Sequence, residues 1–202
     1  MEESKSSKVL NNAVEQLSVL PGIGKRTALR FALFLLKKDK TEVDFFLETI
    51  SKLKTELKFC KICHNISDTD ICHICSDSKR DTHIICVVEN LNDVLAIETT
   101  MQYNGLYHVL GGIISPMEGV SPNELNIASL IERTKNHEIR EIILALPTTM
   151  EGDTTNFFIN KKIDNQDITI SILARGIAVG DELQYTDEIT LGQSIINRKN
   201  FR

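Results

Sequence analysis

The sequence has no long apolar run. Its longest uninterrupted run, Phe31–Leu36, covers six of the 202 residues, whereas a membrane-spanning helix needs about 20. An apolar stretch is also missing behind the acidic, polar N-terminus, so we expect no secretory signal peptide. We therefore expect no membrane association and a cytoplasmic location.

Biased composition is absent as well. We find no internal repeat and no linker of biased composition, and the 42% hydrophobic and 25% charged residues are ordinary for a globular protein. The net charge of −5 is unevenly spread: residues 1–58 carry 11 Lys/Arg against 8 Asp/Glu, and residues 79–202 carry 11 against 17. A mildly basic N-terminal part on an acidic remainder is where a phosphate backbone would be tolerated.

Apolar periodicity predicts the elements. Helical spacing predicts helices near residues 9–20, 25–38 and 42–58. The second is apolar nearly all round, so it must be buried by its own domain or by a partner chain. After residue 79, short apolar runs alternate with helical segments, which predicts a mostly parallel sheet. The predicted strands are 83–88, 106–110, 139–146 and 168–173, and the helical segments are 92–103, 123–136, 150–163 and 186–198.

Four of the five cysteines form two Cys-x-x-Cys pairs separated by eight residues: Cys60, Cys63, Cys72 and Cys75. In a cytoplasmic protein, such tight pairs favour a metal over disulfides. Two intervening residues let both sulfurs of a pair reach one ion, and four thiolates close the tetrahedral shell of Zn²⁺. We predict one structural zinc ion per chain, whose binding stabilises a compact finger.

Other readings of these cysteines stay open. The pairs could be redox-active or incidental, and His64 or His73 could replace a cysteine ligand. The fifth cysteine, Cys86, lies in a predicted strand and is interpreted as a small core residue.

A glycine turn joins the first two predicted helices. Gly22 and Gly24 allow a tight turn and a close approach by another backbone. The turn leads into a helix N-terminus, where free amides and the macrodipole favour an anion. Lys25, Arg26 and Arg30 follow within two turns and can reach flanking phosphates. A plain helical hairpin with solvated cations is the alternative.

The sequence of this turn, Leu-Pro-Gly-Ile-Gly, resembles the helix-hairpin-helix motif of DNA-binding proteins. The resemblance implies DNA contacts that do not depend on base sequence, because backbone amides and cations read charge. The residues expected to make them are Gly22, Gly24, Lys25, Arg26 and Arg30.

Acidic residues follow two of the predicted strands. Glu89 directly follows the strand 83–88, and Glu151 and Asp153 follow the strand 139–146. Ligands bind at the carboxyl ends of parallel strands, and this pattern resembles the Toprim domain of topoisomerases and primases. Catalytic members place an Asp-x-Asp pair at the later strand end to hold Mg²⁺. Here that strand ends in Leu146 and a proline, so we expect no catalysis and leave Mg²⁺ binding open.

The order of these parts resembles the bacterial RecR family of recombination mediators over the full chain. The resemblance implies an α/β multi-domain fold: a helix-hairpin-helix domain (1–56), a four-cysteine (C4-type) zinc finger (57–78), a Toprim domain (79–178) and a C-terminal helical tail for packing or oligomerisation (179–202). The stretches that carry it are Leu20–Gly24, Cys60–Cys75, Val87–Glu89, His108–Gly112, Ile114–Pro116, Pro147–Thr148, Glu151–Gly152, Leu173–Gly176 and Asp187–Gly192.

The family's function is carried over as an expectation. It implies a non-enzymatic DNA-repair protein that assembles as a tetrameric ring around DNA. It implies work with RecO, and in many bacteria RecF, to load recombinase onto single-stranded DNA. The alternatives are a Mg²⁺-dependent Toprim nuclease or primase-like enzyme and a zinc-stabilised adaptor that binds only proteins.

Some residues carry roles by resemblance. The family's DNA contacts on the hairpin helix map onto Arg26 and Arg30. Glu89 and Glu151 correspond to acidic positions of the family that are expected to contact RecO. Two positions depart from the family pattern: Lys25 replaces a usual proline and adds a phosphate contact, and Leu146 replaces a usual asparagine.

Overall fold

The computed structural model describes residues 7–135, 138–164 and 167–200. The chain divides into two compact units, the first ending at Leu57 and the second beginning at Lys58. Residue 136 of a predicted helix and the extreme ends of the first and last predicted domains lie outside the described residues. Within the described ranges, no helix is long and apolar enough to cross a membrane.

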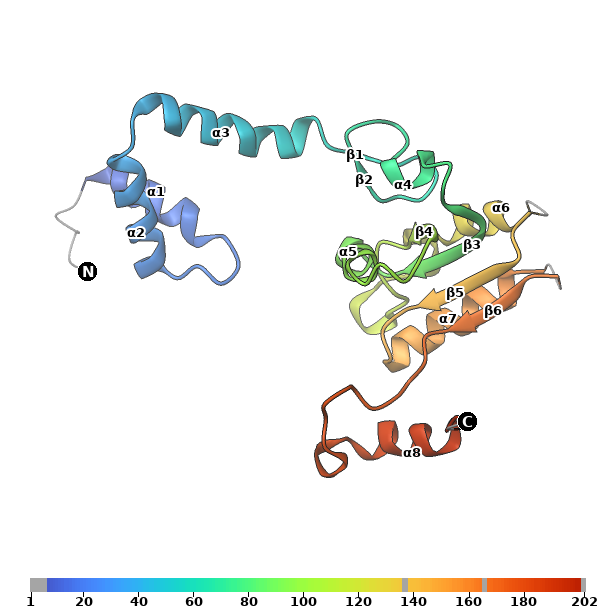
Figure 1. The fold of residues 1–202 in the computed structure, drawn as a ribbon. Coiled ribbons are helices and arrows are strands. Elements are labelled where there is room, and N and C mark those ends of the chain that lie inside the picture. Colours follow the sequence, from blue (N-terminus) through green and yellow to red (C-terminus); the bar gives the residue numbers. More distant parts are fainter. Residues whose placement is uncertain (1–6, 136–137, 165–166, 201–202) are drawn as a thin grey trace. The chain divides into compact units, whose positions relative to one another are not determined.

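The first unit contains three helices, as predicted (Figure 1). They are α1 (Lys8–Ser18), α2 (Lys25–Leu36) and α3 (Lys40–Thr55). The third helix ends before the predicted residue 58, because Lys58 begins the short strand β1 (Lys58–Phe59), which pairs with β2 (Ile66–Ser67).

The first unit buries little of its apolar surface. Helix α2 packs against α1, and its buried residues are the small Ala28 and Ala32. The described residues of α1 and α3 include none that is buried. Its own unit therefore leaves much of this nearly all-apolar helix uncovered.

The second unit is built on a four-stranded parallel sheet with strand order β4-β3-β5-β6, which confirms the predicted α/β class. Helices connect the strands and follow the last one (Figure 1). The strands are β3 (Asp81–Val88), β4 (Gly105–Val109), β5 (Glu141–Ala145) and β6 (Thr169–Ile172). The helices are α4 (His73–Ser76), α5 (Leu91–Thr99), α6 (Ile127–Thr134), α7 (Met150–Lys162) and α8 (Glu188–Ile196), with 3-10 turns at Pro116–Glu118, Pro122–Glu124 and Leu183–Tyr185.

Strand β3 is buried on both faces of the sheet. Ile85 lies in an apolar cluster with Ile159 of α7, whereas the next residue, Cys86, lies in a second cluster with Val94 of α5 and Ile74 of α4. Successive side chains of a strand point to opposite faces, so this apolar run separates two cores. Cys86 is a buried core residue, as predicted.

An ion pair joins the exit of the zinc finger to α5. Arg80 binds both carboxylate oxygens of Glu98, and the Tyr107 hydroxyl donates to Glu98 Oε1 at 2.7 Å. The hydrogen bond from Arg80 lowers the pKa of Glu98. A carboxyl group with a lowered folded-state pKa contributes stability above its unfolded pKa, near 4.3, and loses it as the pH falls through the folded value.

We expect Glu98→Gln to lower the free energy of unfolding by about 1–2 kcal/mol at pH 7. The loss should shrink as the pH falls below about 4.3 and through the lowered pKa of Glu98, where the wild-type carboxylate becomes protonated. Urea denaturation across this range measures both effects. Glu132→Gln, which removes an exposed pair with Lys135, is the matched control and should change little. Equal effects of the two variants would contradict the role given to Glu98.

Candidate nucleic-acid interface and zinc centre

The four cysteine sulfurs converge on one point. All four Sγ atoms lie within 4.8 Å of one another, and Cys63 Sγ and Cys72 Sγ are 3.5 Å apart. A tetrahedral Zn–S bond of about 2.3 Å places sulfurs about 3.8 Å apart, so the cage fits zinc. Backbone amides donate to the sulfurs: Cys72 N to Cys60 Sγ at 3.3 Å and Cys75 N to Cys72 Sγ at 3.5 Å. The cysteines form one structural zinc site, as predicted.

The thiols of the cage share their charge. A hydrogen bond from Cys75 lowers the pKa of Cys63 to about 5, and burial raises the pKa of Cys72 to about 11. The hydrogen bond to Cys63 raises the pKa of Cys75. Four neighbouring thiolates repel one another, and a bound divalent cation stabilises their ionised form.

The predicted histidine substitutes do not join the cage, whose ligand set contains cysteines alone in the described residues. His64 instead contacts the Toprim part. Its Nε2 lies 2.8 Å from Ser129 Oγ on α6, and its ring packs edge-on against His108 of β4. Beside it, Val109 N donates to the Cys63 carbonyl at 2.8 Å. The finger is therefore attached to the outer edge of β4, which sequence reasoning did not foresee.

The two Toprim acids follow neighbouring strands, at the carboxyl ends of the sheet. Glu89 directly follows β3, and Glu151 lies in the first turn of α7, which follows β5. The two strands pair in parallel, with Val88 opposite Ala145. Burial, followed by the charge of Asp93, raises the pKa of Glu89. In the part of the chain that the structure describes, no three carboxylate, histidine or cysteine side chains other than the zinc ligands approach within metal-binding distance.

Two further acids near these strand ends already have partners within the chain. Asp93 Oδ2 accepts from Asn90 N at 2.9 Å and completes the N-terminal cap of α5. Asp153 is bound by the guanidinium of Arg175. Position 152, between Glu151 and Asp153, requires glycine, because a Cβ there would stand 1.9 Å from the Pro147 carbonyl oxygen. Only glycine therefore lets α7 begin this close to β5.

The glycine turn leaves the N-terminus of α2 open. Gly22 has φ of +78°, a conformation that glycine adopts readily. Gly24 caps α2 without a side-chain hydrogen bond, and the first turn carries no acid. A Cβ on Gly24 would meet nothing within 4 Å. Packing within the described chain therefore does not require this glycine, and the space beside the free amides is available to an anion.

Two cations of α2 and Lys37, which follows the helix as its C-cap, lie along one stripe. Arg26, Arg30 and Lys37 are four and seven residues apart, which places them on the same helix face. With Leu29, Leu33 and Phe34 they line one hollow. Among the described residues, none of the three cations makes an ion pair with a carboxylate. We call Arg26, Arg30 and Lys37 the cationic stripe.

Sequence reasoning missed Lys37, although its spacing from Arg30 was a readable signal. It also grouped Lys25 with the arginines. Lys25 is one position from Arg26, about 100° around the helix, and it does not line the hollow of the stripe.

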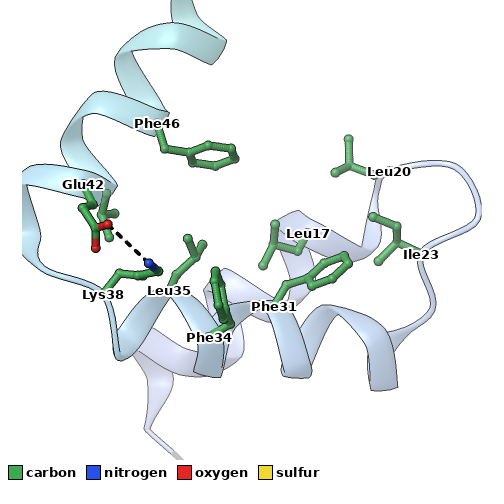
Figure 2. Close-up of a pocket in the computed structure, with 10 residues that line it drawn as sticks. Leu17, Leu20, Ile23, Phe31, Phe34, Leu35, Lys38, Glu42 and Phe46 are labelled. Atoms are coloured by element: carbon green, nitrogen blue, oxygen red, sulfur yellow. Dashed lines mark hydrogen bonds and ion pairs between the residues drawn. The ribbon is translucent and has the colours of Figure 1, made fainter.

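A second hollow in this unit is apolar. It has a volume of about 420 Å³, and its wall includes Leu17 of α1, Phe31 and Phe34 of α2 and Phe46 of α3. Figure 2 shows these side chains around a common space, with the Lys38–Glu42 ion pair (3.3 Å) at one side. Phe34 and Phe46 remain 58% and 46% exposed. We call this hollow the apolar pocket.

The fold and the site define a class: a protein with a helix-hairpin-helix, a four-cysteine zinc finger and a Toprim domain in one chain. Family profiles match this order part by part. They are the RecR helix-hairpin-helix (residues 10–53), the RecR four-cysteine zinc finger domain (57–77), the Toprim domain (83–174) and the RecR C-terminal region (176–199).

Known proteins resemble the chain over its whole length. It is 55% identical to Recombination protein RecR of Phocaeicola vulgatus over all of this chain and 98% of that protein. It is 57% identical to the Flavobacterium johnsoniae protein of the same name over 97% of this chain and 95% of that protein. Recombination protein RecR of Porphyromonas gingivalis is 52% identical over 100% and 97%. The chain belongs to the RecR family.

Proposed function

We propose that this protein is a non-enzymatic mediator of DNA recombination and repair and that it acts in the cytoplasm. It binds DNA through its first unit. The observation that carries the proposal is the cationic stripe, together with the N-terminus of α2, where Gly24 provides no side-chain cap and leaves open space. Amides and cations bind phosphates whatever the bases are. The names of the relatives support the recombination role.

We propose further that a second copy of this chain covers the apolar pocket, and that copies assemble into a ring-like tetramer. The support is apolar surface that the first unit leaves exposed on α2 and α3, and that the C-terminal helix α8 leaves exposed at Ile189 and Ile196. A single chain with few cations binds DNA weakly, whereas several stripes facing one DNA multiply the contacts.

Replacing Phe46 with Glu should dissociate this assembly, because a carboxylate in an apolar contact costs several kcal/mol. We expect the dissociation constant to rise about 100-fold in sedimentation velocity runs at micromolar concentration. Phe157→Glu, at an exposed phenylalanine of α7, is the control and should sediment like the wild type. A wild-type protein that is monomeric at these concentrations would refute the proposed assembly.

We propose the acidic sheet edge at Glu89 and Glu151 as the contact for RecO, with RecF as a further partner, in loading recombinase onto single-stranded DNA. Partly exposed carboxylates at the carboxyl ends of neighbouring strands are suited to a basic protein surface. The proposal gives these acids a binding role, and Mg²⁺ has no assigned place in it.

The test of the proposed function is DNA binding and DNA integrity in the same samples. Fluorescence anisotropy with unrelated sequences should give equal affinities that fall steeply with salt. Plasmid and single-stranded DNA incubated with the protein and Mg²⁺ or Mn²⁺ should remain intact. Cleavage that is lost in Glu89→Gln would instead establish the nuclease alternative, and no binding at low salt would favour the protein-only adaptor.

A further inference from the structure

Arg133 of α6 is a half-buried cation without a carboxylate partner. Its Nη1 donates to the Tyr107 carbonyl at 2.7 Å and to His108 Nδ1 at 3.1 Å. No Asp or Glu forms an ion pair with it anywhere in the described ranges. A charge withdrawn from water is costly unless an opposite charge lies near it. Its two hydrogen bonds go to uncharged acceptors and leave the positive charge of the guanidinium without a neutralising carboxylate.

The histidine that it contacts supplies no charge. His108 is fully buried, and burial lowers its pKa to about 3, so the ring is neutral. Its Nε2 donates to the Asn126 carbonyl at 2.8 Å, which leaves Nδ1 to accept from Arg133. The ring orients Arg133 but does not neutralise it.

The zinc finger lies against the same edge of β4. Tyr107 offers its carbonyl to Arg133, and two residues further on Val109 donates its N–H to the Cys63 carbonyl. Residues two apart in a strand direct their backbone groups to the same side, so Arg133 and the Cys63 knuckle occupy neighbouring places on one strand edge. Tyr107 and Val109 also lie in one apolar cluster with Cys63.

We propose that Arg133 is the counterion of the zinc–tetrathiolate centre. Zn²⁺ with four thiolates carries a net charge of −2, and in a poorly hydrated setting a nearby cation stabilises that charge strongly. Arg133 belongs to α6, so the attraction joins the finger to the Toprim sheet beyond their shared backbone bonds. Groups just outside a metal's ligands tune its affinity in this way.

Zinc retention by the full-length protein tests this role. Arg133→Met keeps most of the side-chain volume and removes the charge, and competition with a chromogenic chelator should show zinc affinity 10- to 100-fold weaker. Lys135→Gln removes an exposed cation from the segment that directly follows α6 and should bind zinc like the wild type. Affinity in Arg133→Met within twofold of the wild type would overturn the proposal.

A second pair of variants separates charge from folding. Arg133→Lys and Arg133→Gln both lose the guanidinium fork, but only the lysine keeps a cation. Zinc release after addition of a thiol reagent should be slow in the Lys variant and at least tenfold faster in the Gln variant. In cobalt-substituted protein, the thiolate-to-metal charge-transfer band should shift in the Gln variant alone. Equal release rates and identical bands would overturn the counterion role and mean that Arg133 acts through its hydrogen bonds only.

Discussion

Cys72→Ser should release the zinc ion and lower the melting temperature by about 10 °C. Loss of a structural metal belongs to the changes that exceed about 4 kcal/mol, and each kcal/mol is worth roughly 2–4 °C in a chain of this size. Cys72 is fully buried, its amide donates to Cys60 Sγ, and its sulfur accepts from the amide of Cys75. Its replacement by serine therefore removes one of the four ligands and the sulfur that accepts from the amide of Cys75.

The damage should spread into the Toprim part, because three of the four zinc ligands lie in one apolar cluster with Tyr107 and Val109 of β4. Metal analysis and thermal unfolding followed by circular dichroism measure both effects. Cys86→Ala is the matched control: it removes a buried sulfur that is not a ligand, and it should retain one zinc per chain. Full thermal stability after zinc removal by EDTA would contradict the structural role of the metal.

Replacing Arg26, Arg30 and Lys37 together with Ala should weaken DNA binding at least 100-fold near physiological salt. The slope of log K against log salt is negative, and each lost phosphate contact reduces its magnitude by about 0.7–0.9. We therefore expect the magnitude of the slope to decrease by at least about 2 per DNA-bound chain. The loss should be the same for every DNA sequence, because phosphate contacts carry no base information. Anisotropy titrations over a range of salt concentrations measure both quantities.

The matched control removes three cations from the second unit: Lys135, Lys161 and Lys162. Net charge changes equally in both triple variants, so only position distinguishes them. The control should keep most of the affinity and nearly the wild-type salt slope. If both variants weaken binding to the same degree, overall charge rather than the cationic stripe determines binding.

Local patterns made much of this fold predictable. The period of the apolar residues located all four strands of the sheet, since a strand buried on both faces, such as β3, reads as an unbroken apolar run. The cysteine ligands could be read from spacing alone, because the geometry of a Cys-x-x-Cys knuckle is set within four residues.

Contacts between distant residues could not be predicted in this way. Cys63 contacts Val109 only because the finger lies along the edge of β4, and Arg133 contacts His108 only because α6 lies beside the same strand. No spacing along the chain encodes that arrangement. Likewise, the apolar character of α2 indicated burial but did not say by what, and in the structure its own unit leaves Phe34 more than half exposed.

Photo-crosslinking is the most direct test of where DNA is held. Single-stranded DNA with a photoreactive group on its backbone is irradiated in complex with the full-length protein, and the crosslinked peptides are identified by mass spectrometry. The proposed function predicts that the DNA crosslinks to residues within the segment from Gly22 to Lys37 and that the DNA remains intact. Crosslinks confined to the sheet edge around Glu89 and Glu151, or strands cut during incubation with Mg²⁺, would contradict it.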